Sequence, residues 1–531
     1  MRRGRLVPDL PTLSEPDVPS VLADGAPPPV SADRLSRRQI RGSSLLLFGR
    51  LISLGTNFLV QVMIVRYLSK GDYGVFAYAL SVVNIAAILV TLGTDRAIGR
   101  FLPIYQEKGR PDQIVGAQLF ILGTIASLGI ASVLLVYGLQ DLVSDSLVDP
   151  RAGPLLLILI VLAPIQAADD VLMNGFAVFS SPRSIFFRRF VLNPVMRLAV
   201  VGLLIATDQD AKFLAIGYVV SGAIGLVVYG VLFARLLRRE GIVPRFGRIR
   251  VSWPVREILV FSIPLLSTDL INVLMGSMDV IILGAFTNAE TVASYRVIAP
   301  VAALNLIVLQ SFSLMYTPAA SRLFAREDAD GVRDLYWQTA AWVAVASFPI
   351  FALTFALAEP LTVLLFQERY ASSAVFLAII AVGRYFDAAL GFNGLTVRVF
   401  GSIAPVVTVN VIAAVVNLIL LFTLIPAYGA LGAAIATGVT LFVFNCLKQL
   451  TLKRVVGIAF FDRRYVGTYA VIVASAMVLL VVQVGVRPPL WIGMLLVIAS
   501  SAIVLRVGRT HLRLEETFPE LGRLPVIRRM V

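Results

Sequence analysis

The stretch VFAYALSVVNIAAILVTLGTDRA at residues 75–97 contains the kind of long apolar run that decides the fold class. A helix needs about 20 apolar residues to cross roughly 30 Å of hydrocarbon, and this stretch is long enough to do so. Over the whole chain, 58% of the residues are hydrophobic and the mean hydropathy is +0.86, more than a soluble protein can bury. Ten-residue segments of alternating polarity, which are typical of a membrane β-barrel, do not occur in the sequence. The sequence therefore predicts an all-α polytopic membrane protein.

Similar apolar segments recur along nearly the whole chain and predict about 14 transmembrane helices. We expect them at approximately 43–65, 75–97, 113–138, 154–178, 184–206, 212–236, 258–284, 290–316, 335–357, 371–397, 404–425, 429–450, 465–485 and 489–506.

The distribution of charge predicts which side of the membrane each connection occupies. The net charge of +14 is of a size found in nucleic-acid-binding proteins, but polytopic membrane proteins gather Lys and Arg on their cytoplasmic side for topological reasons alone. The connection 235–257 holds seven arginines, whereas the connection 139–153 holds three aspartates and one arginine. We therefore expect both termini in the cytoplasm, the cell membrane as the location, and no nucleic acid.

An internal similarity predicts how the segments group. VRYLSKGDYGVFAYA at 65–79 is similar to LGAFTNAETVASYRV at 283–297, a shift of 218 residues that aligns Ser69 with Thr287. Six segments separate the copies, so both have the same orientation and predict two parallel six-helix lobes. The expected divisions are a disordered cytoplasmic tail at 1–42, an N-lobe at 43–236, a basic linker at 237–257, a C-lobe at 258–454, two added helices at 455–506, and a basic cytoplasmic tail at 507–531.

The residue types that hold metals or form disulfides are almost absent. The chain has one cysteine, Cys446, and one histidine, His511. An intrachain disulfide and a histidine-based metal cluster are therefore excluded, and we expect no metal and no cofactor.

Several stretches resemble a known family. RYLSKGDYGVFAYALSVVN at 66–84 and TLGTDRAIGRFLP at 91–103 are similar to the opening of the bacterial polysaccharide flippases, members of the multidrug, oligosaccharidyl-lipid and polysaccharide exporter superfamily. FSIPLLSTDLINVLMGSMDVIILGAF at 261–286, FQERYASSAVFLAII at 366–380 and IPAYGALGAAIATGVT at 425–440 resemble later landmarks of that family, in order. The resemblance covers approximately 43–506.

The resemblance implies a transporter rather than an enzyme. It implies two six-helix lobes around a central cavity, alternating access, and export of a polyprenyl diphosphate-linked oligosaccharide from the inner to the outer leaflet. The implied partners are this substrate, membrane lipids and enzymes of polysaccharide biosynthesis.

Charged residues within the apolar segments are the candidates for handling such a substrate, because each is costly in hydrocarbon. Arginine suits a diphosphate because its planar guanidinium donates paired hydrogen bonds and stays charged. We favour Arg50, Arg296 and Arg384 in the cavity, together with Asp387. Arg384 and Asp387 stand three residues apart on one helix, so a structural ion pair between them is the alternative.

The other buried charges have less specific roles. Asp170 and Asp269 are candidates either for coupling to an ion or for a structural role. We expect Arg197 to bond to Asp169 or Asp170 on the neighbouring helix.

Prolines inside the segments predict helix kinks. They are Pro194, Pro264, Pro300 and Pro405.

Three alternatives stay open at this point. A lipid II flippase or a small-molecule antiporter would use the same fold. A membrane glycan polymerase or ligase would need a polar catalytic loop, and no outward connection exceeds about 15 residues, so an enzyme is disfavoured.

Overall fold

The computed structural model describes residues 32–140, 149–179, 182–243, 251–401 and 403–512. Within these ranges every regular element is a helix. Residues 1–31 of the expected N-terminal tail, 244–250 of the basic linker and 513–531 of the C-terminal tail lie outside the described residues. Helix α1 begins at Ala32, before the expected start at residue 43.

The N-terminal half comprises the elements α1 to α10. They are α1 (Ala32–Tyr67), α2 (Lys70–Thr91), α3 (Thr94–Glu107), α4 (Pro111–Gly138), α6 (Ala152–Leu159), α7 (Leu162–Val178), α8 (Pro182–Ile185), the π-helix η1 (Phe186–Leu192), α9 (Asn193–Ala206) and α10 (Ala211–Arg239).

The C-terminal half comprises α11 to α19, and two further helices follow it. The elements of the half are α11 (Val255–Phe286), α12 (Ala289–Arg296), α13 (Ala299–Ala303), η2 (Leu304–Leu306), α14 (Ile307–Ala325), α15 (Ala329–Phe355), α16 (Ala358–Phe366), η3 (Glu368–Tyr370), α17 (Ser373–Ala389), α18 (Asn393–Val399) and α19 (Ile403–Val456). The final elements, η4 (Arg463–Tyr465), α20 (Val466–Val486) and α21 (Leu490–Leu512), include a helix pair that packs on α15.

Helix α19 is a helical hairpin. Its 54 residues would span about 81 Å as one straight helix, more than twice the hydrocarbon thickness. The chain breaks at Gly429, whose φ of 55° and ψ of −129° are non-helical. The amide of Asn417 donates to the Thr440 hydroxyl at 3.1 Å, which joins the segments on either side of the break.

Eleven helices in the described ranges are long and apolar enough to cross a membrane, or twelve if the bent α11 is one span. Residues 52–67 of α1 form a shorter apolar helix outside that number, and α19 is included as a single helix. The chain is therefore a multi-pass, all-helical membrane protein.

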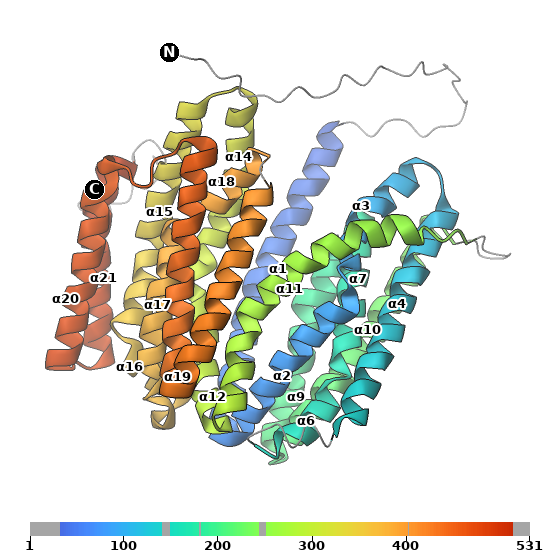
Figure 1. Cartoon of the computed structure of the whole chain (residues 1–531), viewed down its shortest axis with the longest axis horizontal. Coiled ribbons are helices and arrows are strands. Elements are labelled where there is room, and N and C mark those ends of the chain that lie inside the picture. Colours follow the sequence, from blue (N-terminus) through green and yellow to red (C-terminus); the bar gives the residue numbers. More distant parts are fainter. Residues whose placement is uncertain (1–31, 141–148, 180–181, 244–250, 402, 513–531) are drawn as a thin grey trace.

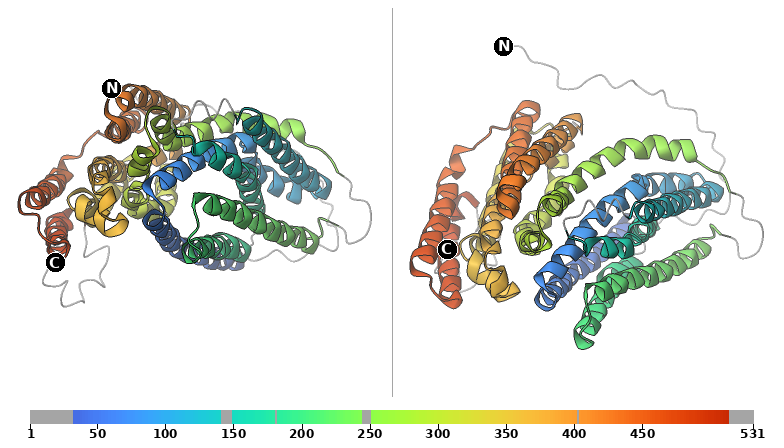
Figure 2. Two further views of the ribbon diagram at one scale, coloured as in Figure 1. Left: turned by 90° about the horizontal axis from the view of Figure 1, so that it is seen from below. Right: turned by 60° about the horizontal axis from the view of Figure 1, so that its bottom comes forward.

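The two halves lie side by side and approach each other at one end (Figures 1 and 2). At this convergent end, formed by the turns after α1 and α11, one apolar cluster includes buried side chains from both halves. A second cluster lies within the C-terminal half and α20–α21. A third consists of N-terminal-half residues apart from the beginning of α11. The largest core shared by the two halves therefore lies at the convergent end, and the beginning of α11 adds a second apolar contact with the N-terminal half through Ile258 and Phe261.

The two turns at the convergent end have equivalent structures, but their residues correspond with a shift one residue larger than the sequence comparison predicts. Ser69 caps α2 by accepting from the Asp72 N–H, and Asn288 caps α12 by accepting from the Thr291 N–H. The equivalent of Ser69 is therefore Asn288, not Thr287. The sequence comparison matched hydroxyl to hydroxyl, whereas Ser and Asn are interchangeable as caps.

Only some of the prolines lie at a break or bend of a helix. Pro300 follows the break between α12 and α13, and Pro405 lies in the first turn of α19. Pro264 lies inside α11, yet the 46° bend of that helix falls between Ile271 and Val273.

Pro194 follows the π-helix η1, with only Asn193 between them, and accounts for it. Proline has no N–H to donate to the carbonyl of Phe190, four residues earlier. The N–H of Asn193 donates to the carbonyl of Arg188, five residues earlier, as in a π-turn. In this wider turn Arg188 is buried, whereas the adjacent Arg189 is exposed.

Candidate functional site

Arg50 lies on α1 and contacts the opposite half. Its guanidinium donates a hydrogen bond to the Gln310 side chain on α14. The residue is exposed, and its partner is neutral. Among the described residues no carboxylate forms an ion pair with Arg50, so its positive charge is not neutralised there.

Arg296 lies at the end of α12, where the C-terminal half meets α2. It is half-buried and interacts electrostatically with the Tyr73 side chain of α2. The Tyr73 hydroxyl accepts a hydrogen bond of 2.5 Å from Gln61 on α1. Within the described ranges Arg296 also forms no ion pair.

Arg384 and Asp387 lie on α17 but do not pair with each other. Asp387 accepts a hydrogen bond from the Asn445 amide at 2.9 Å and lies 3.7 Å from the Lys448 ammonium. Both groups are on the second segment of α19, which packs against α17. The alternative of an Arg384–Asp387 ion pair is therefore wrong, and Arg384 has no ion-pair partner in the part of the chain that the structure describes.

The two acids considered for coupling differ in their surroundings. Asp269 on α11 forms an ion pair with Arg96 on α3, so it joins the two halves. Arg100, one turn further along α3, lies over the Phe261 ring at 4.6 Å. Asp170 on α7 is exposed and forms no ion pair within the described ranges.

Arg197 does not bond to Asp169 or Asp170, contrary to expectation. Asp169 instead pairs with Arg188, whose Nη2 lies 3.0 Å from the carboxylate. Arg197 lies over the ring of Tyr218 on α10, 5.3 Å from its centroid. The π-helix explains the exchange, because it presents Arg188 rather than Arg197 to α7.

The favoured arginines contact different elements: Arg50 donates to Gln310 on α14, and Arg296 interacts with Tyr73 on α2. Three charged residues that sequence reasoning passed over have interhelical contacts: Arg96, Arg188 and Lys448. The adjacent arginines in FFRRF at 186–190 were the available signal for Arg188.

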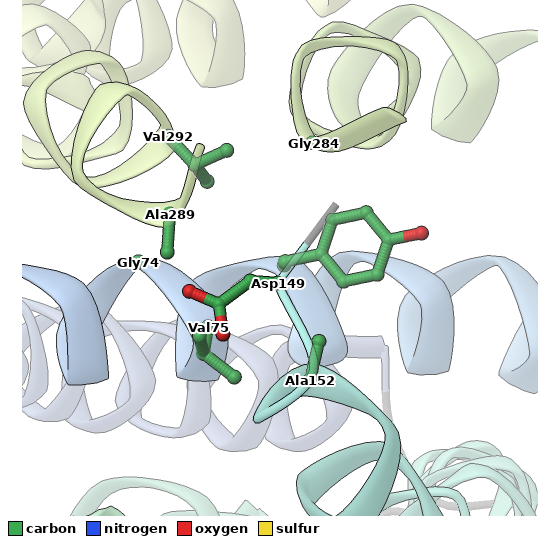
Figure 3. A pocket seen from close by; sticks show the side chains of 8 residues that line it. Gly74, Val75, Asp149, Ala152, Gly284, Ala289 and Val292 are labelled. Carbon is green, nitrogen blue, oxygen red and sulfur yellow. The ribbon is translucent and has the colours of Figure 1, made fainter. Parts of the chain in front are cut away.

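The convergent end is closed by close backbone packing of α2 on α12. A Cβ atom at Gly74 would overlap the backbone carbonyl of Ala289. Figure 3 shows the small space beside this contact, with Asp149 directed into it. Its volume is about 10 Å³, room for at most about one water molecule. No substrate can pass between α2 and α12 in this conformation.

Two arginines close the other side of the convergent end. Arg66 at the end of α1 donates to the carbonyls of Leu364 and Leu365 at the end of α16. Arg369 donates in return to the carbonyls of Val65 and Arg66 at the end of α1. Each guanidinium thus satisfies carbonyls that a helix end leaves unpaired, and its charge favours the negative end of the helix dipole.

A third arginine, Arg151, lies directly before α6 and contacts two carboxylates. Arg151 hydrogen-bonds to Asp149 at 2.9 Å and lies 3.2 Å from Asp72. These hydrogen bonds hold the pKa of the Asp149 carboxyl below its usual value, so it is ionised at neutral pH.

The described residues contain no group of three His, Cys, Asp or Glu side chains placed to hold a metal ion.

The comparisons with known proteins agree with the fold. The protein is multi-pass and helical, and its two halves are joined at one end. Its sequence matches place it in the multidrug, oligosaccharidyl-lipid and polysaccharide exporter superfamily. The chain belongs to the family described as polysaccharide biosynthesis protein, whose sequence pattern matches residues 40–324. The MatE pattern matches residues 264–423. The predicted family is thereby confirmed.

The similar proteins are flippases or membrane proteins. A membrane protein of Methanocaldococcus jannaschii is 22% identical over 464 residues, which cover 81% of this chain and 87% of that protein. A probable low-salt glycan biosynthesis flippase, Agl15 of Haloferax volcanii, is 22% identical over 79% of this chain and 84% of its own length. The lipid II flippase MurJ, in an inward closed conformation, shares the fold with a TM-score of 0.63, at 14% identity over 88% of this chain and 99% of that one. These names agree with the prediction that the chain is not an enzyme.

We expect the Arg369→Ala variant to open the convergent end more often. It loses two charge-assisted hydrogen bonds, worth about 1–2 kcal/mol after allowance for solvent, or about a tenfold change in the equilibrium. Spin labels on cysteines at Gln209 and Glu359, with Cys446→Ala, would report the separation of the halves by double electron–electron resonance. A longer-distance population should grow.

Arg487→Ala is the matched control, since Arg487 is also exposed but has no partner in the described ranges. An unchanged distance distribution in Arg369→Ala, or an equal change in Arg487→Ala, would show that the reciprocal contacts do not hold the halves together.

Proposed function

We propose that this protein is a flippase that moves a polyprenyl diphosphate-linked oligosaccharide from the inner to the outer leaflet of the cytoplasmic membrane. The observation that carries the proposal is the distribution of interhalf contacts. A shared apolar core joins the halves at the convergent end, whereas away from it Arg50 contacts Gln310 and Arg96 contacts Asp269, the latter beside the packing of the beginning of α11 on α3. Water or a polar substrate can take the place of the Arg50–Gln310 contact, whose residues are exposed. Family membership and the name of the Haloferax relative support the same class of cargo.

The proposed topology has fourteen spans, with both termini in the cytoplasm. To the eleven apolar helices it adds the bent α11, the helix α1 and the division of α19 at Gly429. Two six-helix lobes, approximately 43–236 and 258–454, are then followed by the pair 455–506. This orientation places the convergent end at the outer surface, so the described conformation is closed to the outside.

The proposed diphosphate contacts are the arginines without carboxylate partners. Arg50, Arg296 and Arg384 each keep their charge uncompensated among the described residues, which leaves bidentate donors available to phosphate. Asp387 has a different role, since Asn445 and Lys448 occupy its carboxylate. It orders the packing of α17 on α19 and is withdrawn from the substrate contacts.

The two aspartates considered for ion coupling, Asp269 and Asp170, have different proposed roles. Asp269 has a structural role in joining the halves, through Arg96. Asp170, exposed and unpaired in the described ranges, is the proposed site of any ion coupling. The substrate is supplied and consumed by enzymes of polysaccharide biosynthesis.

The hairpin in α19 predicts that the residues at its break and after its end lie on opposite sides of the membrane. In a Cys446→Ala background, single cysteines at Tyr428 and Phe460, both exposed, would be treated with a membrane-impermeant maleimide. We expect labelling of intact cells at position 428 only, and labelling at position 460 after the membrane is opened. Labelling of both positions from one side would contradict the fourteen-span topology.

Replacing Arg50, Arg296 and Arg384 together by alanine should reduce transport by about a hundredfold or more, because charge-assisted hydrogen bonds contribute about 1.5–3 kcal/mol each. Transport is measured in proteoliposomes as the movement of a fluorescent polyprenyl diphosphate oligosaccharide between leaflets.

The matched control replaces three exposed arginines at helix ends, Arg110, Arg326 and Arg487, by alanine. Full movement in the first triple variant would refute the site. Absence of movement by the wild-type protein, together with Asp269-dependent efflux of a cationic dye, would replace the flippase with an antiporter.

A further inference from the structure

A polar cavity lies inside the N-terminal half, apart from the three arginines discussed above. Its volume is about 270 Å³, and helices α1, α2, α7, α9 and α10 surround it together with η1. Its polar lining includes Gln61, Asn84, Gln166, Asp169, Arg188 and Arg197. We call it the N-terminal cavity. At about 30 Å³ per water molecule it holds roughly nine waters, which is the scale of one sugar ring.

Much of its hydrogen-bonding capacity is unused by the protein. Among the described residues, the side chains of Asn84, Gln166 and Arg197 make no hydrogen bond. The Asp169 side chain keeps 27% of its surface exposed, so water-sized molecules reach the cavity. Unpaired amides and a guanidinium within apolar helices are costly unless something polar occupies the space.

The charge of the cavity favours an anion. Arg188 and Arg197 line it against a single carboxylate, Asp169, which Arg188 already neutralises. The Arg197 guanidinium therefore supplies an uncompensated positive charge. It is held over the Tyr218 ring, which leaves its N–H groups free to donate.

The fold makes room for this arrangement. The π-helix η1 places Arg188 inside the half, and π-turns in helices are frequently associated with function. A Cβ atom at Gly225 on α10 would overlap the Arg188 guanidinium. The paired Arg188 and Asp169 thus form one fixed wall, and Arg197 faces the space with its charge available.

We propose that the N-terminal cavity binds a carboxylate-bearing sugar residue of the transported oligosaccharide, with Arg197 pairing with the carboxylate. This inference rests on the proposed flippase function and deepens it. Amide side chains such as Asn84 and Gln166 both donate and accept, as sugar hydroxyls require. A guanidinium pairs with a planar carboxylate through two parallel hydrogen bonds.

Other occupants fit the cavity less well. A cation would meet a net positive charge and find no free carboxylate. A diphosphate would use the positive charge but leave the amides on the far walls without matched hydroxyl partners. The acidic sugar alone uses both the charge and the amides.

The test measures binding of free glucuronate to the full-length protein in nanodiscs, by saturation-transfer difference NMR, with glucose and inorganic pyrophosphate for comparison. We expect glucuronate to bind saturably and glucose about tenfold more weakly, the difference being the ion pair. Arg197→Gln should weaken glucuronate binding about tenfold or more, and Arg197→Lys should restore part of it.

Arg189→Gln is the matched control, since Arg189 is the exposed neighbour of Arg188 and does not line the cavity. Thermal unfolding of Arg197→Gln should shift only slightly, because the variant loses the contact with the Tyr218 ring and no ion pair. Three outcomes would overturn the proposal: no glucuronate binding, equal binding by Arg197→Gln, or displacement of glucuronate by pyrophosphate at a lower concentration, which would assign the cavity to phosphate.

Transport of lipid-linked oligosaccharide by the wild-type protein is measured in parallel. Transport without glucuronate binding would refute the cavity assignment and leave the flippase function standing. Glucuronate binding without any transport would refute the flippase function and leave an acidic-sugar site in a protein of another role.

Discussion

Every polar group placed in hydrocarbon needs a partner, and the rest of this structure depends on that constraint. Three aspartates within the apolar helices have a cationic partner, in the ion pairs Arg188–Asp169, Arg96–Asp269 and Lys448–Asp387. Each joins two different elements, so the cost of burying a charge fixes which helices are neighbours and in which register. Arg96–Asp269 does so between the halves, and the other two do so within one half each.

The same constraint shapes the backbone. Pro194 removes one donor from its helix, and the chain responds with the π-turn that places Arg188 beside Asp169. At the convergent end, helices α1 and α16 end with unpaired carbonyls, and Arg369 and Arg66 donate to them across the contact between the halves. Local irregularities and interhalf contacts are therefore consequences of one requirement. Because these contacts involve the ends of helices and not their middles, they can be exchanged for water without unfolding either half.

The sequence was sufficient for the class of structure and insufficient for the partners of its charges. Long apolar runs predict helices directly, since only helices satisfy the backbone of such segments in a membrane. The partner of a charged side chain depends on the direction in which that side chain projects from its helix. A π-turn changes this direction by a fraction of a turn, and the periodicity of the sequence does not reveal the change. The sequence therefore predicts an aspartate partner for Arg197, whereas in the structure Asp169 pairs with Arg188. Arg384 and Asp387 share a helix at favourable spacing, but Lys448 lies more than 60 positions along the chain and approaches only through the fold. The sites themselves stay predictions, because guanidiniums carry only donors and make no contact with one another that could show a shared site.

The arginines divide into two groups according to whether the protein neutralises them. Arg96 and Arg188 are paired with carboxylates, so their positive charge is neutralised within the protein. Arg50 donates to an amide and Arg197 lies over a ring. Arg296 interacts electrostatically with Tyr73, and Arg384 forms no ion pair among the described residues. A guanidinium without a counter-ion is tolerated at membrane depth only where water or an anion reaches it. These four positions occur in both halves, on α1, α9, α12 and α17. A substrate with more than one negative group, spread over a lipid diphosphate and an acidic sugar, matches such separated charges better than a compact anion would.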